Sequence, residues 1–348
     1  MNMQKTVPAP FSRGVNFSMW LEARTLEDVR VDMFSRQDFV NAKALGCDVV
    51  RIPTHFERFC DAEKGYLLPE KLTDILDSVV AWAEELQLYV VLDFHNNTHS
   101  DSFTRPDVET VLTPIWTQLA ERYKNATEYL VFEIMNEPHG IDIPLWNSVV
   151  ERVFKAIRAI DSKHWIIVGG ADWNSAEAMK TLPDFQDDKV IYTFHFYDPH
   201  TFTHQGASWC HMQRVLGLPF PYDEAKMPPL PEDPTEDELR RFRNYPKDGQ
   251  LSTVTDCFDE YAAFSLERNA PIYCGEFGCF MSVPEETRVA WYRIVVEQLE
   301  ARGIARTSWD YYGGFGVFQR GERGVRPQFP RDLNRPLLKA LGLNDAAE

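Results

Sequence analysis

Eight short apolar runs, each followed by a polar segment and then a helical pattern, constrain the fold of this chain more than any other feature. The runs are rich in Val and Ile and apolar throughout, as expected for parallel strands covered on both faces. They are Val15–Phe17, Val49–Ile52, Val90–Leu92, Leu130–Ile134, Ile166–Val168, Val190–Phe194, Ile272–Cys274 and Ile304–Trp309. Between them, stretches such as 145–160 place apolar side chains three or four residues apart, which predicts amphipathic helices.

This alternation through eight units predicts a single (β/α)8 barrel, a TIM barrel, over residues 1–348. A doubly wound sheet is the alternative, but the chain lacks the glycine-rich phosphate turns GxGxxG and GxxxxGK[ST]. The barrel is therefore the predicted fold.

One repeat is irregular, because the distance from Val190 to Ile272 is about twice the usual one, and the excess is rich in Pro and acidic residues. We interpret it as a long Pro-rich loop after the sixth strand, and our hypothesis is that it forms a wall or lid over a cleft. Deletion of Leu218–Asp233 should then change substrate range more than thermal stability.

The net charge of -17 argues against nucleic acid and anionic membranes as partners. No apolar run is long enough for a transmembrane helix. The first residues lack the apolar core of a secretion signal, so the sequence as given predicts a cytoplasmic protein, or a secreted one if a leader has been removed. The histidines show no HExxH or similar spacing, so no metal site is expected, and the oligomeric state is left open.

Two glutamates that close apolar runs are the leading candidates for catalysis. Glu137 stands between Asn136 and Pro138 after the fourth run, and Glu276 follows the seventh. Pro138 ends its strand because it has no N–H to donate. Strand ends meet on one face of a barrel, so we expect the two carboxylates in one cleft. Such a pair suits cleavage of a glycosidic bond, with retention at a separation of about 5–5.5 Å and inversion at a wider one.

Other polar and aromatic residues follow the predicted strands and should reach the same face. Aromatic rings stack on pyranose rings, and amides and imidazoles bind hydroxyl groups, as a sugar-binding cleft requires. The candidates are Arg51, His95, Asn96, Asn136, Trp173, His195, Tyr197, Trp209 and Trp309, with Trp20 as a further possible platform. Each also suits a structural role when taken alone: Arg51 could form a salt bridge inside the barrel, and Trp309 could be ordinary core.

These motifs together resemble glycoside hydrolase family 5, the cellulase-type retaining β-glycanases whose two catalytic glutamates lie on strands four and seven. The resemblance covers the chain from Gly14 to the eighth strand. The segments that carry it are Asp48–Pro53, Val91–Asn96, Phe132–Pro138, His195–Tyr197, Gly275–Gly278 and Ser308–Trp309.

The resemblance implies that Glu137 is the general acid and then the general base, and that Glu276 is the nucleophile. It implies that Arg51 and Tyr197 hold Glu276 and stabilise its charge. No cofactor or metal is implied, since the chemistry needs only two carboxyl groups and water.

The same resemblance implies that Asn136 binds the 2-hydroxyl of the sugar at the cleavage site, the −1 subsite. His95 and His195 would line this subsite and Trp309 would form its platform. The segment 202–206, Phe-Thr-His-Gln-Gly, is similar to one in bacterial cellulases of the family.

We therefore expect a retaining enzyme that acts on a β-glucan or oligosaccharide, with endo-β-1,4-glucanase (cellulase) as the leading interpretation. An exo-β-1,3-glucanase, a β-mannanase or another β-glycosidase of the family are alternatives. A non-catalytic glycan-binding barrel is a further alternative, disfavoured because both glutamates are present.

Overall fold

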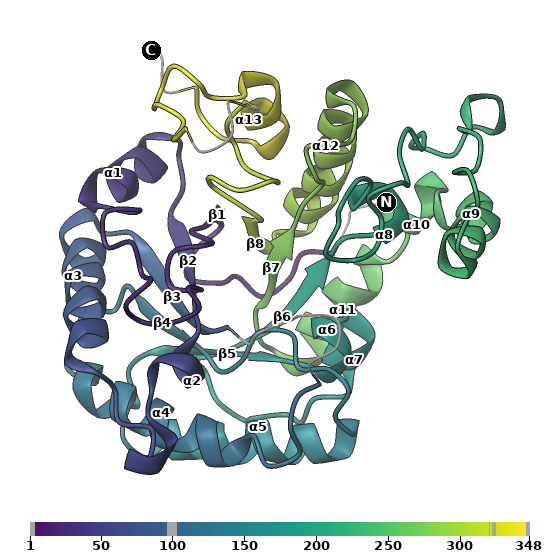
Figure 1. Cartoon of the computed structure of the whole chain (residues 1–348). Coiled ribbons are helices and arrows are strands. Elements are labelled where there is room, and N and C mark those ends of the chain that lie inside the picture. The colour runs from purple at the N-terminus through teal and green to yellow at the C-terminus, as the bar shows by residue number, and fades with distance from the viewer. Residues whose placement is uncertain (1–3, 96–102, 320, 322–324, 346–348) are drawn as a thin grey trace.

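Eight parallel strands close into a barrel in the computed structural model, which describes residues 4–95, 103–319, 321 and 325–345 (Figure 1). Each strand pairs with the next along the chain, and β1 pairs with β8. The strands are β1 (Arg13–Asn16), β2 (Val49–Thr54), β3 (Tyr89–Phe94), β4 (Leu130–Glu133), β5 (Trp165–Gly169), β6 (Val190–Phe196), β7 (Ile272–Phe277) and β8 (Ala305–Ser308). Every predicted run overlaps one strand, so the predicted TIM barrel is confirmed.

Helices surround the barrel and cover its outer face (Figure 1). The longer ones are α1 (Arg36–Ala44), α3 (Glu70–Leu86), α4 (Glu109–Tyr123), α5 (Ile143–Arg158), α9 (Glu236–Asp248), α11 (Phe258–Arg268) and α12 (Glu285–Arg302). The shorter ones are α2 (Phe56–Phe59), α6 (Ala171–Asn174), α7 (Ala176–Lys180), α8 (His200–Thr203), α10 (Leu251–Thr255) and α13 (Arg335–Leu341), with two 3-10 turns, η1 (Ala62–Lys64) and η2 (Glu224–Lys226). Within the part of the chain that the structure describes, no helix has the length and apolar character needed to span a membrane.

Local sequence explains where these helices begin and end. The Asp142 side chain caps α5 by accepting a hydrogen bond from the backbone N–H of Leu145 at 3.1 Å. α12 ends at Gly303, whose φ of 71° lies in the left-handed region that favours glycine. α5 buries the apolar face that the spacing at 145–160 predicts, including Val149, Val153 and Ile157.

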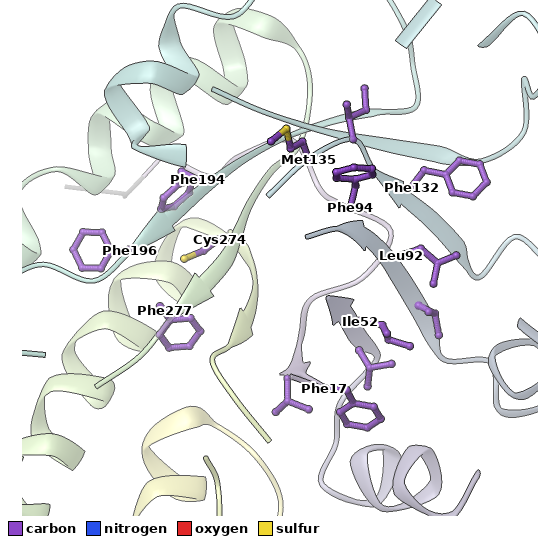
Figure 2. Close-up of a cluster of buried hydrophobic side chains, with 14 of the residues drawn as sticks. Phe17, Ile52, Leu92, Phe94, Phe132, Met135, Phe194, Phe196, Cys274 and Phe277 are labelled. Atoms are coloured by element: carbon purple, nitrogen blue, oxygen red, sulfur yellow. The ribbon is translucent and has the colours of Figure 1, made fainter. Parts of the chain in front are cut away.

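Most of the core lies between the barrel and its helices. Figure 2 shows part of it, with Ile52, Leu92 and Phe132 on successive strands, and all three side chains are fully buried. A second, smaller cluster fills the barrel itself, and its members are Phe11, Val49, Val91, Val131, Ile167, Ile191, Tyr273 and Ala305.

The next layer of residues inside the barrel, toward the carboxyl ends of the strands, is polar rather than apolar. Successive side chains of a strand point to opposite faces, so the residues two positions further along each strand also point into the barrel. They are Arg51, Asp93, Glu133, Gly169, Thr193, Gly275 and Thr307, all small, polar or charged. The barrel interior therefore changes from apolar to polar toward the carboxyl ends of the strands, where the site lies.

The long segment after β6 is present, but it is not only a loop. Its Pro-rich part leads into α9 and α10, and Figure 1 shows α9 to the side of the barrel. α9 starts with a capping box between Thr235 and Glu238. Its only apolar positions before Pro246 are Leu239, Phe242 and Tyr245, and Pro246 stands in its last turn, which explains why no long apolar stripe revealed it.

Candidate active site

A cleft of about 660 Å³ opens at the carboxyl ends of the strands. Its lining residues are His95, Asn136, Glu137, Asp172, Trp173, Ser175, His195, Tyr197, Asp198, His200, His204, Trp209, Cys210, Glu276, Trp309 and Phe315. Of the residues predicted for the site, Arg51 lies beneath the cleft floor with its side chain fully buried. Asn96 lies outside the described residues. All the others except Trp20 line the cleft.

A β-bulge places Glu276 in this cleft. The pairing between β6 and β7 shifts register, so that Phe194 pairs with Cys274 but His195 pairs with Glu276, and Gly275 is the extra residue. A Cβ at Gly275 would lie 3.0 Å from Thr193 Oγ1 and 3.1 Å from His195 Nε2, closer than ordinary packing allows. A side chain at position 275 would therefore crowd Thr193 and His195, which favours glycine at the bulge that directs the Glu276 side chain.

Glu137 reaches the cleft from the turn after β4. Its φ of 42° lies in the left-handed region, which costs a non-glycine residue about 1–2 kcal/mol. The turn is fixed by His139, whose Nδ1 lies 2.8 Å from the Glu137 carbonyl oxygen, and by the N–H of Trp173, which donates to the Pro138 carbonyl at 3.1 Å. These contacts hold the Glu137 carboxyl in one position.

The two carboxyl groups and His195 form the centre of the site. Ligand atoms of Glu137, His195 and Glu276 all lie within 4.8 Å of one another. His195 Nδ1 is 2.7 Å from Glu137 Oε1 and 3.7 Å from Glu276 Oε2. Burial lowers the pKa of His195 to about 4, so the ring is neutral near pH 7 and its contact with Glu137 is a hydrogen bond rather than an ion pair.

Among the described residues, these same three side chains also place possible metal ligands close enough together to hold an ion. An ion bound there would lie between the two carboxyl groups. It would therefore compete with any substrate bond that these groups act on.

Arg51 organises the floor of the cleft. Its Nη1 donates to Glu276 Oε1 at 2.7 Å, and its Nε and Nη2 donate to the two carboxyl oxygens of Glu133 at 2.7 and 3.0 Å. Nη2 also lies 3.0 Å from Asp93 Oδ2. One buried guanidinium thus contacts three carboxyl groups, with the forked geometry that arginine provides.

Two further hydrogen bonds set the orientation of residues in the cleft. Arg51 Nη2 donates to Asn136 Oδ1 at 2.8 Å, which identifies this atom as the amide oxygen and leaves the NH2 group of Asn136 as the donor. Tyr197 donates its hydroxyl hydrogen to Glu276 Oε2 at 2.8 Å. Burial raises the pKa of Tyr197 well above its usual range, which keeps the hydroxyl protonated.

Burial dominates the acid–base behaviour of the other carboxyl groups. It raises the pKa of Glu137 to about 7, while Arg51 and His139 act in the opposite direction. Burial also raises the pKa of Asp93 to about 7 and raises the pKa of Glu133. In both cases the positive charge of Arg51 acts in the opposite direction. The single guanidinium of Arg51 does not fully offset the desolvation of Asp93 and Glu133, so the pKa values of both carboxyl groups stay raised.

Aromatic side chains form the walls. Trp309 stacks on His95 with ring centroids 5.8 Å apart, Trp173 is 38% exposed, and Trp209 is 53% exposed. Trp20, the weaker candidate, is only 1% exposed and belongs to the core, where it packs against Phe34. The prediction of a platform at Trp20 is therefore wrong, because the turn after β1 directs its ring inward.

The segment after β6 contributes one wall of the cleft, through residues between Tyr197 and Cys210. Among the described residues that line the cleft, none comes from 218–233. Leu218 and Phe220 are instead buried in the core, and Tyr245 of α9 donates to the Pro219 carbonyl at 2.5 Å. Leu218 and Phe220 thus pack in the core, while residues 221–233 are exposed or half-buried, and the effect of the deletion on substrate range stays a prediction.

Sequence reasoning missed Glu22, which belongs to the turn after β1. Its Oε1 lies 3.6 Å from His95 Nε2, and Oε2 accepts a hydrogen bond from the Met19 N–H. Burial raises the pKa of Glu22 to about 8. Glu22 does not close an apolar run, so no local signal marked it. It reaches His95 because Leu21 forms a bridge with Thr54 of β2.

Known proteins match the chain over most of its length. Residues 22–314 match the family described as cellulase, glycosyl hydrolase family 5. Endoglucanase C of Acetivibrio thermocellus is 28% identical over 340 residues, which cover 93% of this chain and 98% of that protein. Endoglucanase 3 of Fibrobacter succinogenes is 27% identical over 346 residues, which cover 92% of this chain but 52% of that protein, about half its length.

Among solved structures, Thermotoga maritima Cel5A in complex with mannotriose or with cellobiose is 29% identical, with a TM-score of 0.74. The match covers 95% of this chain and 97% of that one. The family match spans more than half of the chain, and the barrel and its paired glutamates agree with it. This chain therefore belongs to glycosyl hydrolase family 5, the cellulase family, and is a glycoside hydrolase.

Proposed function

We propose that this protein is a retaining endo-β-1,4-glucanase, with Glu276 as nucleophile and Glu137 as acid and base. The observation that carries the proposal is the approach of the Glu137 and Glu276 carboxyl oxygens to within 4.8 Å in an open cleft. Retaining enzymes have carboxyl groups about 5–5.5 Å apart, whereas inverting enzymes need a wider gap for water.

Glu276 suits the role of nucleophile because both of its oxygens accept hydrogen bonds from strong donors. Arg51 donates to Oε1 and Tyr197 donates to Oε2. These bonds orient the Glu276 carboxyl group. In the first step, an oxygen of Glu276 bonds to the anomeric carbon as the bond to the leaving sugar breaks.

Glu137 suits the complementary role because burial raises its pKa to about 7, so it keeps a proton in weakly acidic solution. It gives this proton to the oxygen of the leaving sugar. As a carboxylate it then takes a proton from the water that attacks the glycosyl–Glu276 ester, which frees Glu276 and restores the acid.

The remaining cleft residues suit a sugar chain. The NH2 group of Asn136 is a donor for a hydroxyl beside the reacting carbon, and Trp309 offers an aromatic face next to it. Exposed Trp173 and Trp209 also line the open cleft, which favours binding within a chain rather than at its end. The relatives named endoglucanases support the same substrate class.

The proposal is tested by mass spectrometry of products from carboxymethyl cellulose, mixed-linkage glucan, laminarin, glucomannan and cello-oligosaccharides. The Glu276→Gln variant serves as the blank. A ladder of cello-oligosaccharides is expected. Glucose alone from laminarin would contradict the proposal and identify an exo-acting enzyme, and no hydrolysis of any substrate would favour a glycan-binding barrel.

β-Mannan is the second candidate substrate, favoured by one observation. Cel5A of Thermotoga maritima has been solved with mannotriose as well as with cellobiose. Manno-oligosaccharides as the main products from glucomannan would support this alternative over the β-glucanase.

A further inference from the structure

The exposed rings of Trp173 and Phe103, joined through the buried ring of His139, form an aromatic surface beside the cleft. The rings of Trp173 and His139 are stacked, with centroids 3.5 Å apart and an angle of 10° between their planes. The ring of Phe103 meets His139 at an angle of 62°, with centroids 6.4 Å apart. The three residues come from the segments after β5, β4 and β3, which are adjacent strands of the barrel.

Phe103 is exposed, and the residue that follows it is tied to the turn after β4. Its side chain is 71% exposed, the largest exposure among the exposed hydrophobic side chains described. The next residue, Thr104, is tied to His139 twice: its N–H donates to the His139 carbonyl at 2.9 Å, and its hydroxyl accepts from the His139 N–H at 3.0 Å.

The Phe103 ring packs directly against Gly140. A Cβ at Gly140 would lie only 2.0 Å from Phe103 Cδ1, and the φ of Gly140 is 66°. Glycine is therefore needed both for the turn and for the close approach of the ring. An aromatic ring that is fixed in place and open to solvent loses little conformational entropy when a ligand stacks on it.

The position of Glu137 shows on which side of the scissile bond this aromatic surface lies. Under the proposed function, Glu137 protonates the leaving-group oxygen, so the sugars released first lie on its side of the cleft. Trp173 and His139 contact the turn that carries Glu137, through the Pro138 and Glu137 carbonyls. The aromatic surface therefore extends from the leaving-group side.

We propose that Phe103 is a distal platform for the leaving-group part of a β-glucan chain, one step beyond the sugar that packs on Trp173. The assignment rests on the proposed function. The centroids of Phe103 and Trp173 are at most about 10 Å apart, given their distances to His139. A single oligosaccharide chain thus reaches both rings.

The test uses Phe103→Ala in the full-length chain. Two quantities are measured: the bond at which reducing-end-labelled cellohexaose is cut, and kcat/KM for cellohexaose relative to that for an aryl cellobioside. The aryl group occupies only the position next to the scissile bond. Loss of the platform should move cleavage toward the reducing end and lower the kcat/KM ratio about two- to tenfold, the range of one aromatic contact.

Two further variants serve as controls. Phe103→Trp retains an aromatic face and should keep the wild-type cleavage pattern. Leu266→Ala removes an exposed apolar side chain from α11, near the opposite end of the barrel, and should leave the ratio unchanged.

The outcomes separate the two proposals. If the wild-type protein cleaves cellohexaose and Phe103→Ala shows the same cleavage pattern and the same kcat/KM ratio, the platform proposal is overturned and the proposed function stands. An equal loss on both substrates would also overturn the platform proposal, because it would reflect a general disturbance of the site. Failure of the wild-type protein to cleave any cello-oligosaccharide would overturn the proposed function and the platform together.

Discussion

Arg51 Nη1 lies 2.7 Å from Glu276 Oε1, and the Arg51 side chain is completely buried. The same guanidinium contacts Asp93 and Glu133, so one cation holds three carboxyl groups beneath the cleft. A buried charge without a partner is strongly destabilising, whereas a bonded one fixes geometry. The contact therefore couples the stability of the barrel to the position of the proposed nucleophile.

Arg51→Met should destabilise the protein by about 3–5 kcal/mol, because it leaves the carboxyl groups without a counter-charge. The pKa values of Asp93 and Glu133 are already raised by burial, and loss of Arg51 should raise them further. The destabilisation should then be larger at pH 8, above the raised pKa of Asp93, than at pH 5, where the Asp93 carboxyl group is protonated. Chemical unfolding at both pH values measures it, with surface Arg293→Met as the control. An equal loss of unfolding free energy at pH 5 and pH 8 would contradict the electrostatic explanation.

Glu276→Gln should reduce kcat by about 10⁴-fold or more, because the amide is not a competent nucleophile. Folding and binding of cellotetraose should be largely retained, as shown by circular dichroism and calorimetry. Exposed Glu297→Gln should behave as the wild type. Retained turnover in the Glu276 variant would disprove the nucleophile assignment.

Glu137→Ala should spare aryl glycosides with good leaving groups far more than natural glucans. Only a poor leaving group needs a proton from the acid, a contribution of about 10²–10⁴-fold. Rates of glycosylation across a series of aryl cellobiosides provide the measurement. If the glycosylation rate falls by the same factor for every aryl leaving group, Glu137 is not the acid.

The pH profile of the wild-type enzyme should have its alkaline limb near the pKa of Glu137, about 7. Glu137 must be protonated to act as the acid, so kcat/KM should fall as the pH rises through this value. The limb should be absent in Glu137→Ala assayed with an activated aryl glycoside. A profile that stays flat to pH 9 in the wild type would refute this assignment of the limb.

The segment after β6 should separate into a packing part and a binding part. Phe220→Ala removes a ring that is 5% exposed and should cost about 3–5 kcal/mol of stability with an unchanged KM. Trp209→Ala removes a ring that is 53% exposed in the cleft wall and should raise KM several-fold with little change in melting temperature. Thermal melts and kinetics on both variants test this division, and the reverse pattern would contradict it.

The sequence was most informative where local pattern and structure coincide. Apolar runs located all eight strands, since a strand covered on both faces must be apolar throughout. Glu137 and Glu276 were found because each closes such a run, and strand ends of a barrel share one face. The candidate cleft residues were found in the same way.

Residues whose role depends on distant neighbours were not recognisable. Asp93 and Glu133 lie within or at the end of strands, but only barrel closure brings both to Arg51. Glu22 reaches His95 from a turn without any apolar run. α9 was missed because it has few apolar residues and contains Pro246.

The sequence by itself determined the barrel, the identity of the paired carboxyl groups and the face on which they meet, because hydrophobic periodicity is a local property of the chain. Tertiary structure alone decided that Trp20 is core while Trp209 is exposed, and that Phe103 rests on Gly140. It also decided the separation of the two glutamates, through the bulge at Gly275 and the left-handed turn at Glu137. These outcomes depend on which segments pack together when the barrel closes, and no local pattern records that.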